Sequence, residues 1–407
     1  MLTNKQDFRK ALGVIVLFGL VSLFGDLAYE GARSVNGPYL KLLAVNAATL
    51  GLISGFGELL GYALRLVSGY LADKTKSYWF LTFLGYGLLV SVPLLSLAGV
   101  WQVAALLIIL ERVGKAIRSP ARDTILSQAS SQVGTGFGFG LHEAMDQIGA
   151  IAGPLIFTVF FIMVGKPAGI AEYQKAYAFL WIPVILVIFC LVISCRKVPN
   201  PQTLEVKKNR VSDTLSKTFW VYNIFSFFST AGFCSFIIIA FHFKVTGLLS
   251  DAQIPLFYAI AMGIDAAAAL LIGKSYDLLN ARRVNSYAGL NLLILVPLFS
   301  VAMPFFAFSQ SMPFILVGLA LWGIVMGIQE TIMRSAIADI TSLKKRGIGY
   351  GIFNTTYGVA IFLGSYLFGA LYDRSLSLVF LAAIILELIA LFVFMLMRKE
   401  ILKEGLK

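Results

Sequence analysis

Charged side chains are scarce in this sequence. Only 13% of the 407 residues are charged, whereas 58% are hydrophobic and the mean hydropathy is +0.84. A soluble globular protein carries about 25% charged residues. Most side chains must therefore face hydrocarbon or other helices, which argues against a soluble domain and favours an integral membrane protein.

Cysteine and histidine are also rare. The three cysteines lie in or beside apolar segments, and there are only two histidines: Cys190, Cys195, Cys234, His142 and His242. This pattern argues against a disulfide framework and against a metal cluster. The sequence also has no Walker motif, HExxH, CxxC or nucleophile elbow, and nothing resembles a selectivity filter. We therefore expect no cofactor, no enzymatic activity, no ATP site and no channel.

Long apolar runs are abundant. A membrane-spanning helix needs about 20 apolar residues. Runs of this kind lie near residues 11–35, 48–72, 79–98, 101–122, 136–164, 176–195, 219–243, 253–274, 285–308, 313–335, 348–370 and 376–397. The sequence therefore predicts an all-α membrane protein with 12 transmembrane helices.

The net charge of +12 has two interpretations. It suggests nucleic-acid binding, but the basic residues fall between apolar runs, as expected for cytoplasmic loops under the positive-inside rule. One side would hold Lys5, Arg9, Lys10, Lys74, Lys76, Arg196, Lys197, Lys207, Lys208, Arg210, Lys217, Arg282, Arg283, Lys344, Lys345, Arg346, Arg398, Lys399, Lys403 and Lys407. The other side would hold only Lys41, Lys166, Lys175, Lys244 and Arg374. We favour cytoplasmic termini, a cytoplasmic central loop and no nucleic-acid partner.

The two halves of the sequence echo each other. Gly69-Tyr-Leu-Ala-Asp73-Lys74 follows the second run, and Gly273-Lys-Ser-Tyr-Asp277 follows the eighth. Gly138-Phe-Gly140 in the fifth run likewise corresponds to Gly349-Tyr-Gly351 in the eleventh. Such repeats are typical of transporters built from two related halves. They predict an N-terminal bundle over residues 1–195, a cytoplasmic linker over 196–217 and a C-terminal bundle over 218–407.

Two segments of the sequence resemble motifs of the major facilitator superfamily. Residues 69–74 match its loop signature G-x-L-A-D-[RK], although the basic tail of the signature is degenerate here. Gly149-Ala-Ile-Ala-Gly153-Pro154 resembles the core of the motif associated with its antiporters, with Phe157 and Thr158 in place of the trailing glycines. The resemblance implies two six-helix bundles related by pseudo-two-fold symmetry, alternating access, and a location in the prokaryotic cytoplasmic (inner) membrane. We also expect a monomer surrounded by lipid.

Ionisable residues within the apolar runs are expensive, at about 2.5–3.5 kcal/mol each at the membrane centre. They should face the protein interior or water. Successive helical residues turn by about 100°, so spacings of three and four share a face. This places Asp26, Glu30 and Arg33 on one stripe of the first helix, and Glu111, Lys115, Arg118 and Arg122 on one stripe of the fourth, with Arg112 a quarter-turn away. These stripes indicate a polar cavity or ion pairs between helices.

The expected depth of each residue in the membrane distinguishes gate residues from residues of a proton-coupling site. We predict a cytoplasmic gate of Gly69, Asp73, Lys74, Arg118, Arg122, Asp123 and Asp277, in which Asp73 pairs with Arg118 or Arg122 or caps the eleventh helix near Gly347. Asp26, Glu58 and Arg112 lie nearer mid-depth. Burial there opposes the charged form of a carboxylate, and a nearby arginine favours it. Asp26 is our first candidate for a proton carrier and Glu30 the second, while a permanent Asp26–Arg112 ion pair is the alternative.

Helix five and the C-terminal half supply the remaining candidates. His142, Glu143 and Asp146 suggest a metal site, but pairing with basic groups of neighbouring helices is the favoured interpretation. Gly149, Gly153 and Pro154 are expected to shape a bend or a tight helix contact. The C-terminal half offers Asp265, Glu330 and Arg334.

These observations favour a secondary transporter that exports a small organic compound in exchange for protons. An importer of an anionic metabolite, attracted by the basic residues, and a divalent-metal exporter remain the alternatives.

Overall fold

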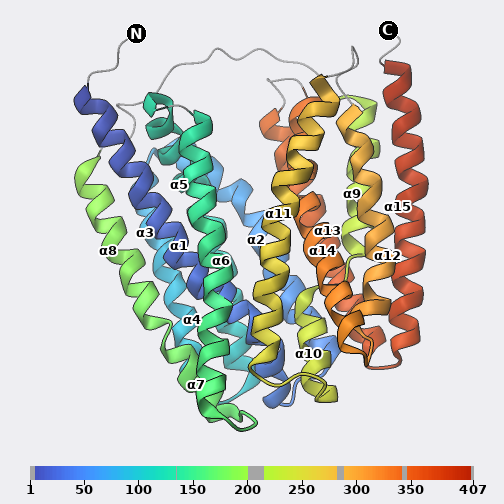
Figure 1. Ribbon diagram of the computed structural model, residues 1–407. Helices are drawn as coiled ribbons and strands as arrows, with labels where there is room; N and C mark the ends of the chain where they lie inside the picture. Colours follow the sequence, from blue (N-terminus) through green and yellow to red (C-terminus); the bar gives the residue numbers. More distant parts are fainter. Residues whose placement is uncertain (1–4, 134, 200–214, 282–287, 342–345, 405–407) are drawn as a thin grey trace. The chain divides into compact units, whose positions relative to one another are not determined.

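The computed structural model describes residues 5–133, 135–199, 215–281, 288–341 and 346–404. Their helices, labelled in Figure 1, divide between two compact units. Each unit holds most of one half of the sequence and a short segment of the other. The first consists of residues 1–44, 60–209 and 249–259, and the second of residues 45–59, 210–248 and 260–407.

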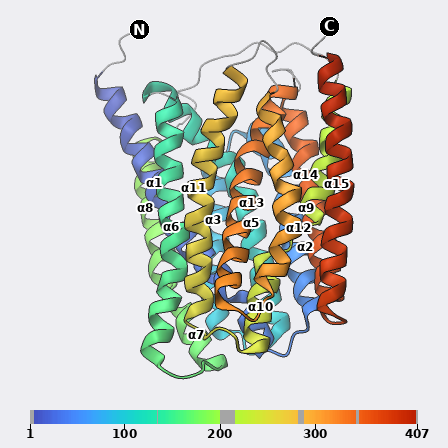
Figure 2. The same cartoon turned by 45° about the vertical axis from the view of Figure 1, so that its right-hand side comes forward.

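The helices of the first unit begin with α1 (Lys5–Leu42), and α2 (Ala47–Thr75) belongs to this unit from Leu60 onward. There follow α3 (Tyr78–Gly87), α4 (Ser91–Leu94), α5 (Trp101–Val133), α6 (Thr135–Val164), α7 (Ile170–Ala178) and α8 (Trp181–Lys197). α1 packs against α6 and α8, and the three run side by side in Figures 1 and 2. α5 packs against α3 and contacts α1 and α6. The face of α1 toward α5 and α6 therefore lies inside the unit.

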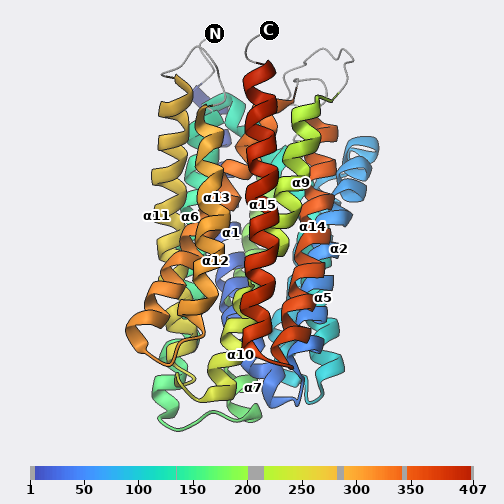
Figure 3. The same cartoon turned by 90° about the vertical axis from the view of Figure 1, so that its right-hand side faces the viewer.

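The second unit contains the beginning of α2 and most of α11 (Gln253–Ala281), which changes unit after Ala259. Its other helices are α9 (Lys217–Ala231), α10 (Phe236–Thr246), α12 (Leu295–Ala307), α13 (Met312–Ile340), α14 (Arg346–Tyr372) and α15 (Leu376–Glu404). α15 lies between α9 and α12, as Figure 3 shows, and packs against both.

Eleven helical stretches in the described part of the chain are long and apolar enough to cross a membrane. Some combine two labelled helices, such as Lys217–Thr246, which contains α9 and α10. α5 supplies the twelfth predicted crossing. At 33 residues it is long enough, but its ionisable residues interrupt the apolar pattern. The predicted set of spanning helices is therefore confirmed, while the side on which the termini lie and the bundle boundaries at residues 195 and 218 stay predictions.

Glycines set the closest helix contact in the first unit. An ideal Cβ atom on Gly149 would lie 2.3 Å from the carbonyl oxygen of Leu23, and one on Gly153 would lie 2.4 Å from that of Leu27. Only glycine permits this approach between α6 and α1. Small residues have this role at helix contacts in membranes, where apolar side chains gain little by leaving lipid. The contact holds the polar stripe of α1 beside α6.

This contact predicts opposite results for two glycines of α6. Gly153→Ala should lower the free energy of unfolding by about 1–3 kcal/mol, because the added methyl group overlaps backbone atoms of α1. Gly140→Ala, whose Cβ would meet no atom within 4 Å, should be neutral or slightly stabilising. Equilibrium unfolding in mixed micelles measures both variants. Equal stabilities would contradict the proposed role of Gly153.

Candidate functional site

The ionisable residues of the first unit gather where α1, α5 and α6 meet. We call ten of them the charge cluster: Asp26, Glu30 and Arg33 on α1, Glu111, Arg112, Lys115, Arg118, Arg122 and Asp123 on α5, and Asp146 on α6. Five are carboxylates and five are cations. The predicted stripes of the first and fourth spanning helices thus lie on packed faces of α1 and α5.

Tyr29 of α1 lies among three cations of the cluster. The Lys115 ammonium group is 4.0 Å from the ring centroid, the Arg112 guanidinium carbon 4.5 Å and the Arg33 guanidinium carbon 6.0 Å. Tyr29 itself is 4% exposed. An aromatic face attracts cations most strongly where water is excluded. The ring therefore holds three positive side chains together, a role that the sequence pattern of ionisable residues does not reveal.

Glu111 provides the negative charge for two buried arginines of α5. Its carboxylate oxygens lie 3.6 Å from Nε of Arg112 and 3.7 Å from a terminal nitrogen of Arg118. All three side chains are less than 10% exposed. The Arg118 guanidinium also lies 4.7 Å from the ring centroid of Tyr86 on α3. Arg118 is therefore a buried residue inside the unit, and its place in the cytoplasmic gate stays a prediction.

Glu30 connects α1 to the first residues of α11. The hydroxyl of Tyr258 donates a 2.5 Å hydrogen bond to Oε2 of Glu30, and Arg33 lies 3.4 Å from Oε1. Glu30 and Tyr258 are both buried. With these two partners, Glu30 is held more firmly than a freely exchanging proton carrier requires, so it is a weaker candidate than Asp26.

The predicted group on α6 separates into residues with different surroundings. Asp146 accepts a hydrogen bond from Ser22 of α1 and lies near Arg122 and Lys115, as the pairing interpretation requires. His142 is buried near Arg122 and Asp146, while Glu143 is exposed. Within the described residues, no three His, Cys, Asp or Glu side chains are grouped so as to hold a metal ion.

Asp26 differs from every other carboxylate of the cluster. It lies near Asp146, Lys115, Glu30 and Arg118, yet it makes no hydrogen bond and no ion pair within 4 Å to any described residue. Its side chain is partly exposed. Arg112 pairs with Glu111, so the structure does not form the alternative Asp26–Arg112 pair.

Three predicted gate residues, Asp73, Lys74 and Asp277, lie near the ends of α2 and α11. All three are exposed. Asp73 pairs with neither Arg118 nor Arg122 in the described residues, because these arginines lie against Glu111 and, at 2.8 Å, against Asp123. Gly347 lies outside the residues whose side chains are described. Gly69 approaches α5, where its Cβ would be 3.6 Å from Pro120.

In the second unit, the predicted residues do not form a comparable cluster. Glu58 lies in the part of α2 that belongs to this unit, Asp265 is fully buried on α11 and Glu330 is exposed on α13. The side chain of Arg334 lies outside the described ones. Gly323 and Gly327 of α13 pack tightly on α11, with ideal Cβ positions 2.4 Å from the oxygen of Ala261 and 2.7 Å from that of Asp265. Glu387 of α15, which we did not predict, is 0% exposed.

The sequence matches that of a known family along almost its whole length. The model of the Major Facilitator Superfamily aligns with residues 18–299 and 291–406. This chain belongs to the Major Facilitator Superfamily.

Its relatives in the superfamily include bacterial and archaeal proteins. An uncharacterized protein of Mycobacterium tuberculosis is 38% identical over 385 residues, which cover 93% of this chain and 91% of that protein. An uncharacterized MFS-type transporter of Methanocaldococcus jannaschii is 24% identical over 397 residues, 95% of each chain. The family and its spanning helices make this chain an integral protein of the prokaryotic inner membrane and a transporter rather than an enzyme.

Solved superfamily structures share the fold. A bacterial homolog of the human lysosomal transporter Spinster, inward-facing and unoccupied, aligns with a TM-score of 0.71 at 15% identity, covering 97% of this chain and 98% of that one. The nucleoside transporter NupG aligns with a TM-score of 0.68 at 14% identity, covering 95% and 99%. At these identities the likeness concerns the fold alone.

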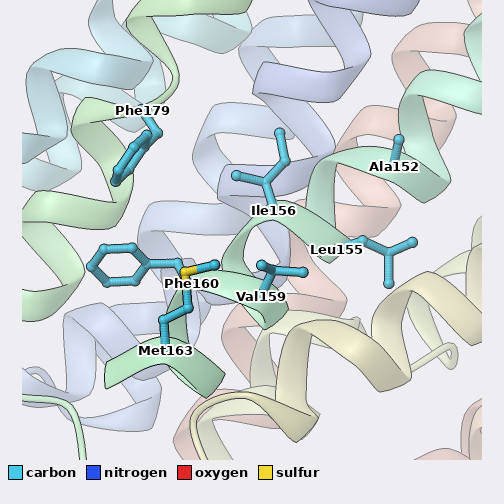
Figure 4. A pocket seen from close by; sticks show the side chains of 7 residues that line it. All are labelled: Ala152, Leu155, Ile156, Val159, Phe160, Met163 and Phe179. Atoms are coloured by element: carbon cyan, nitrogen blue, oxygen red, sulfur yellow. The ribbon is translucent and has the colours of Figure 1, made fainter. Parts of the chain in front are cut away.

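Two hollows in the first unit of this superfamily member differ in chemistry. A small one beside the charge cluster is lined partly by Tyr29, Asn36, Glu111 and Arg112. A larger one of about 440 Å³, shown in Figure 4, is lined only by Ala152, Leu155, Ile156, Val159, Phe160, Met163 and Phe179. The larger pocket is lined by no charged or hydrogen-bonding side chain, whereas the small hollow borders Glu111 and Arg112 of the cluster. The polar cavity stays a prediction.

The shared role of Glu111 gives a stability prediction. Glu111→Gln removes the negative charge between two buried guanidinium groups and should cost about 3–5 kcal/mol in the free energy of unfolding. Asp123→Asn removes the partner of Arg122, but Asp123 is 51% exposed. Its loss should therefore cost at most about 1 kcal/mol. Thermal and denaturant unfolding in detergent compares the two, and a Glu111→Gln protein as stable as Asp123→Asn would disprove the shared pairing.

Proposed function

We propose that this chain is a proton-coupled secondary transporter that exports a small organic compound by alternating access. Membership of the superfamily establishes the coarser statement, a secondary transporter of a small solute. The direction, the coupling ion and the class of solute are the proposal. They depend on the charge cluster of the first unit.

The single observation that carries proton coupling is the environment of Asp26. A proton carrier must change its protonation state without dismantling the fold. Glu30, Glu111 and Asp146 each have a hydrogen-bond or ion-pair partner, so protonating any of them breaks a buried interaction. Asp26 makes no such bond within the described residues and is partly exposed. It can therefore accept and release a proton at the lowest structural cost.

Charge balance explains how protons and solute exchange. The cluster contains five carboxylates and five cations, so it is neutral when Asp26 is ionised and carries one positive charge when Asp26 is protonated. The ionised form accommodates a solute with a positive charge or hydrogen-bond donors. Protonation removes that preference, and Lys115 and Arg118 near Asp26 then repel a cation. Competition of proton and solute for one carboxylate produces antiport.

The cations around Tyr29 support a second candidate. Arg33, Arg112 and Lys115 place three positive groups on one aromatic ring. Arginine recognises carboxylate and phosphate groups through paired hydrogen bonds. An anionic metabolite would bind here best when Asp26 is protonated, so proton and solute would move together. This candidate is the importer, and the two schemes differ in the sign of coupling.

Alternating access in the proposal uses rocking of two six-helix bundles. The exposed Asp73, Lys74 and Asp277 at helix ends remain our proposed gate residues. Arg118, which lies buried against Glu111, stays in the proposed gate as well.

The test begins with a thermal-shift screen of the purified chain against organic cations, organic anions and divalent metals at two pH values. A ligand at about 100 times its dissociation constant stabilises a protein by about 2.7 kcal/mol. The stabilising compound is then added to proteoliposomes that contain a pH-sensitive dye. We expect Asp26→Asn to abolish solute-driven proton movement while solute–solute exchange continues, because the neutral side chain still permits rocking but binds no proton.

Glu172→Gln is the control, since Glu172 of α7 pairs with Lys166 in the loop before α7, away from the cluster, and its loss should leave both activities unchanged. Proton movement that persists in Asp26→Asn would overturn the assignment of Asp26. Movement of protons and an anion in the same direction would favour the importer over the exporter.

A further inference from the structure

The second unit buries a carboxylate in the middle of a transmembrane helix. Glu387 is the twelfth residue of the 26-residue spanning stretch Leu376–Ile401 of α15, and it is 0% exposed. It is also the only ionisable residue of that stretch before Arg398. An isolated carboxylate is costly at this depth and marks a functional site when it occurs. The charge cluster does not include it.

The surroundings of Glu387 consist of hydroxyl groups and backbone. The hydroxyls of Ser229 on α9 and Ser300 on α12 face the carboxyl group, and both serines are 0% exposed. Oε1 lies so close to α9 that an ideal Cβ on Gly232 would be 2.7 Å from it. Within the described residues, neither carboxylate oxygen nor either serine hydroxyl makes a hydrogen bond of normal geometry. Two hydroxyl oxygens and two carboxylate oxygens, all buried, therefore lie close together.

The helix opposite Glu387 is interrupted at the same level. α9 ends at Ala231 and α10 begins at Phe236, so residues 232–235 break a crossing that extends from Lys217 to Thr246. The C-terminal turn of α9 leaves carbonyl groups without helical partners. In transporters, unwound backbone and helix C-termini of this kind coordinate small cations near the membrane midplane.

No cationic side chain neutralises Glu387 in the described part of the chain. α12 contains no ionisable residue, and Lys217 of α9 lies at the start of its helix, 3.4 Å from Glu400. Cys234 at the break is buried. A lone buried carboxylate must be neutralised, either by a proton or by a positive partner. The oxygen donors point to a hard cation, and the single negative charge points to a monovalent one.

We propose that Glu387, Ser229 and Ser300, together with the backbone at the α9–α10 break, form a Na⁺-binding site in the second unit. Bound Na⁺ would join α9, α12 and α15, which already pack together. The proposal goes beyond proton coupling at Asp26 and does not depend on it, since a cation can bind here whether or not the charge cluster carries protons.

The experiment measures Na⁺ binding without transport. The purified full chain is titrated with NaCl against KCl at constant ionic strength, while its melting temperature and its uptake of radioactive sodium are recorded. We expect the wild type to be stabilised by Na⁺ but not by K⁺. Glu387→Gln should weaken Na⁺ binding by at least about 100-fold, because it removes the only charge among the ligands. Ser229→Ala/Ser300→Ala should weaken binding while it keeps the carboxylate.

Glu400→Gln is the matched control, because it makes the same substitution on the same helix beside Lys217 and should bind Na⁺ as the wild type does. If Glu387→Gln does not fold, the serine variant provides the test alone. Absence of Na⁺-specific stabilisation in the wild type would overturn the proposal, as would Na⁺ binding that survives in both variants. A response to pH with none to Na⁺ would also overturn it and assign Glu387 to a proton. These readings involve neither Asp26 nor solute, so failure here leaves the proposed function standing.

Discussion

A charge within the hydrocarbon thickness must find a partner or a polar cavity, and this constraint organises the first unit. Ten ionisable side chains meet on α1, α5 and α6, and nearly every one has an identified counter-charge or hydrogen bond. Glu111 and Tyr29 are central because each contacts more than one cation. The neutral total allows so many charges to remain buried, and Asp26 is the one carboxylate of the cluster without a bond to a described residue.

Close helix contact makes this pairing geometrically strict. Hydrogen bonds and charge-assisted pairs need short distances between their donor and acceptor atoms. Gly149 and Gly153 bring α6 against α1, so Ser22 reaches Asp146 across the same contact. A larger residue at either glycine would separate the helices and also displace the polar groups. The glycine motif of α6 thus acts through helix packing, and this packing also positions the charged groups.

The sequence was sufficient to predict the crossings and the family, because apolar length and short motifs are local properties. It placed Asp26, Glu30 and Arg33 on one face for the same reason. It did not identify partners, since a helical period defines a face but not the neighbour opposite it. The helical period therefore did not reveal that Arg118 packs on Tyr86 and Glu111. The length of α5 was also underestimated. The helix extends beyond the predicted run 101–122 to Val133, because its polar residues continue the helix.

Asp26 and Glu387 illustrate two ways to keep a carboxylate in a membrane. Asp26 is surrounded by charges of both signs, so one proton changes the balance of a cluster that remains otherwise intact. Glu387 lies beside serine hydroxyls and a broken helix, and in our proposal a bound cation balances its charge. The sequence did contain a signal for Glu387, a lone acid in an apolar run of α15. Its serine neighbours gave none, because Ser229 and Ser300 come from helices far apart in the chain, and only folding brings their oxygens to one point.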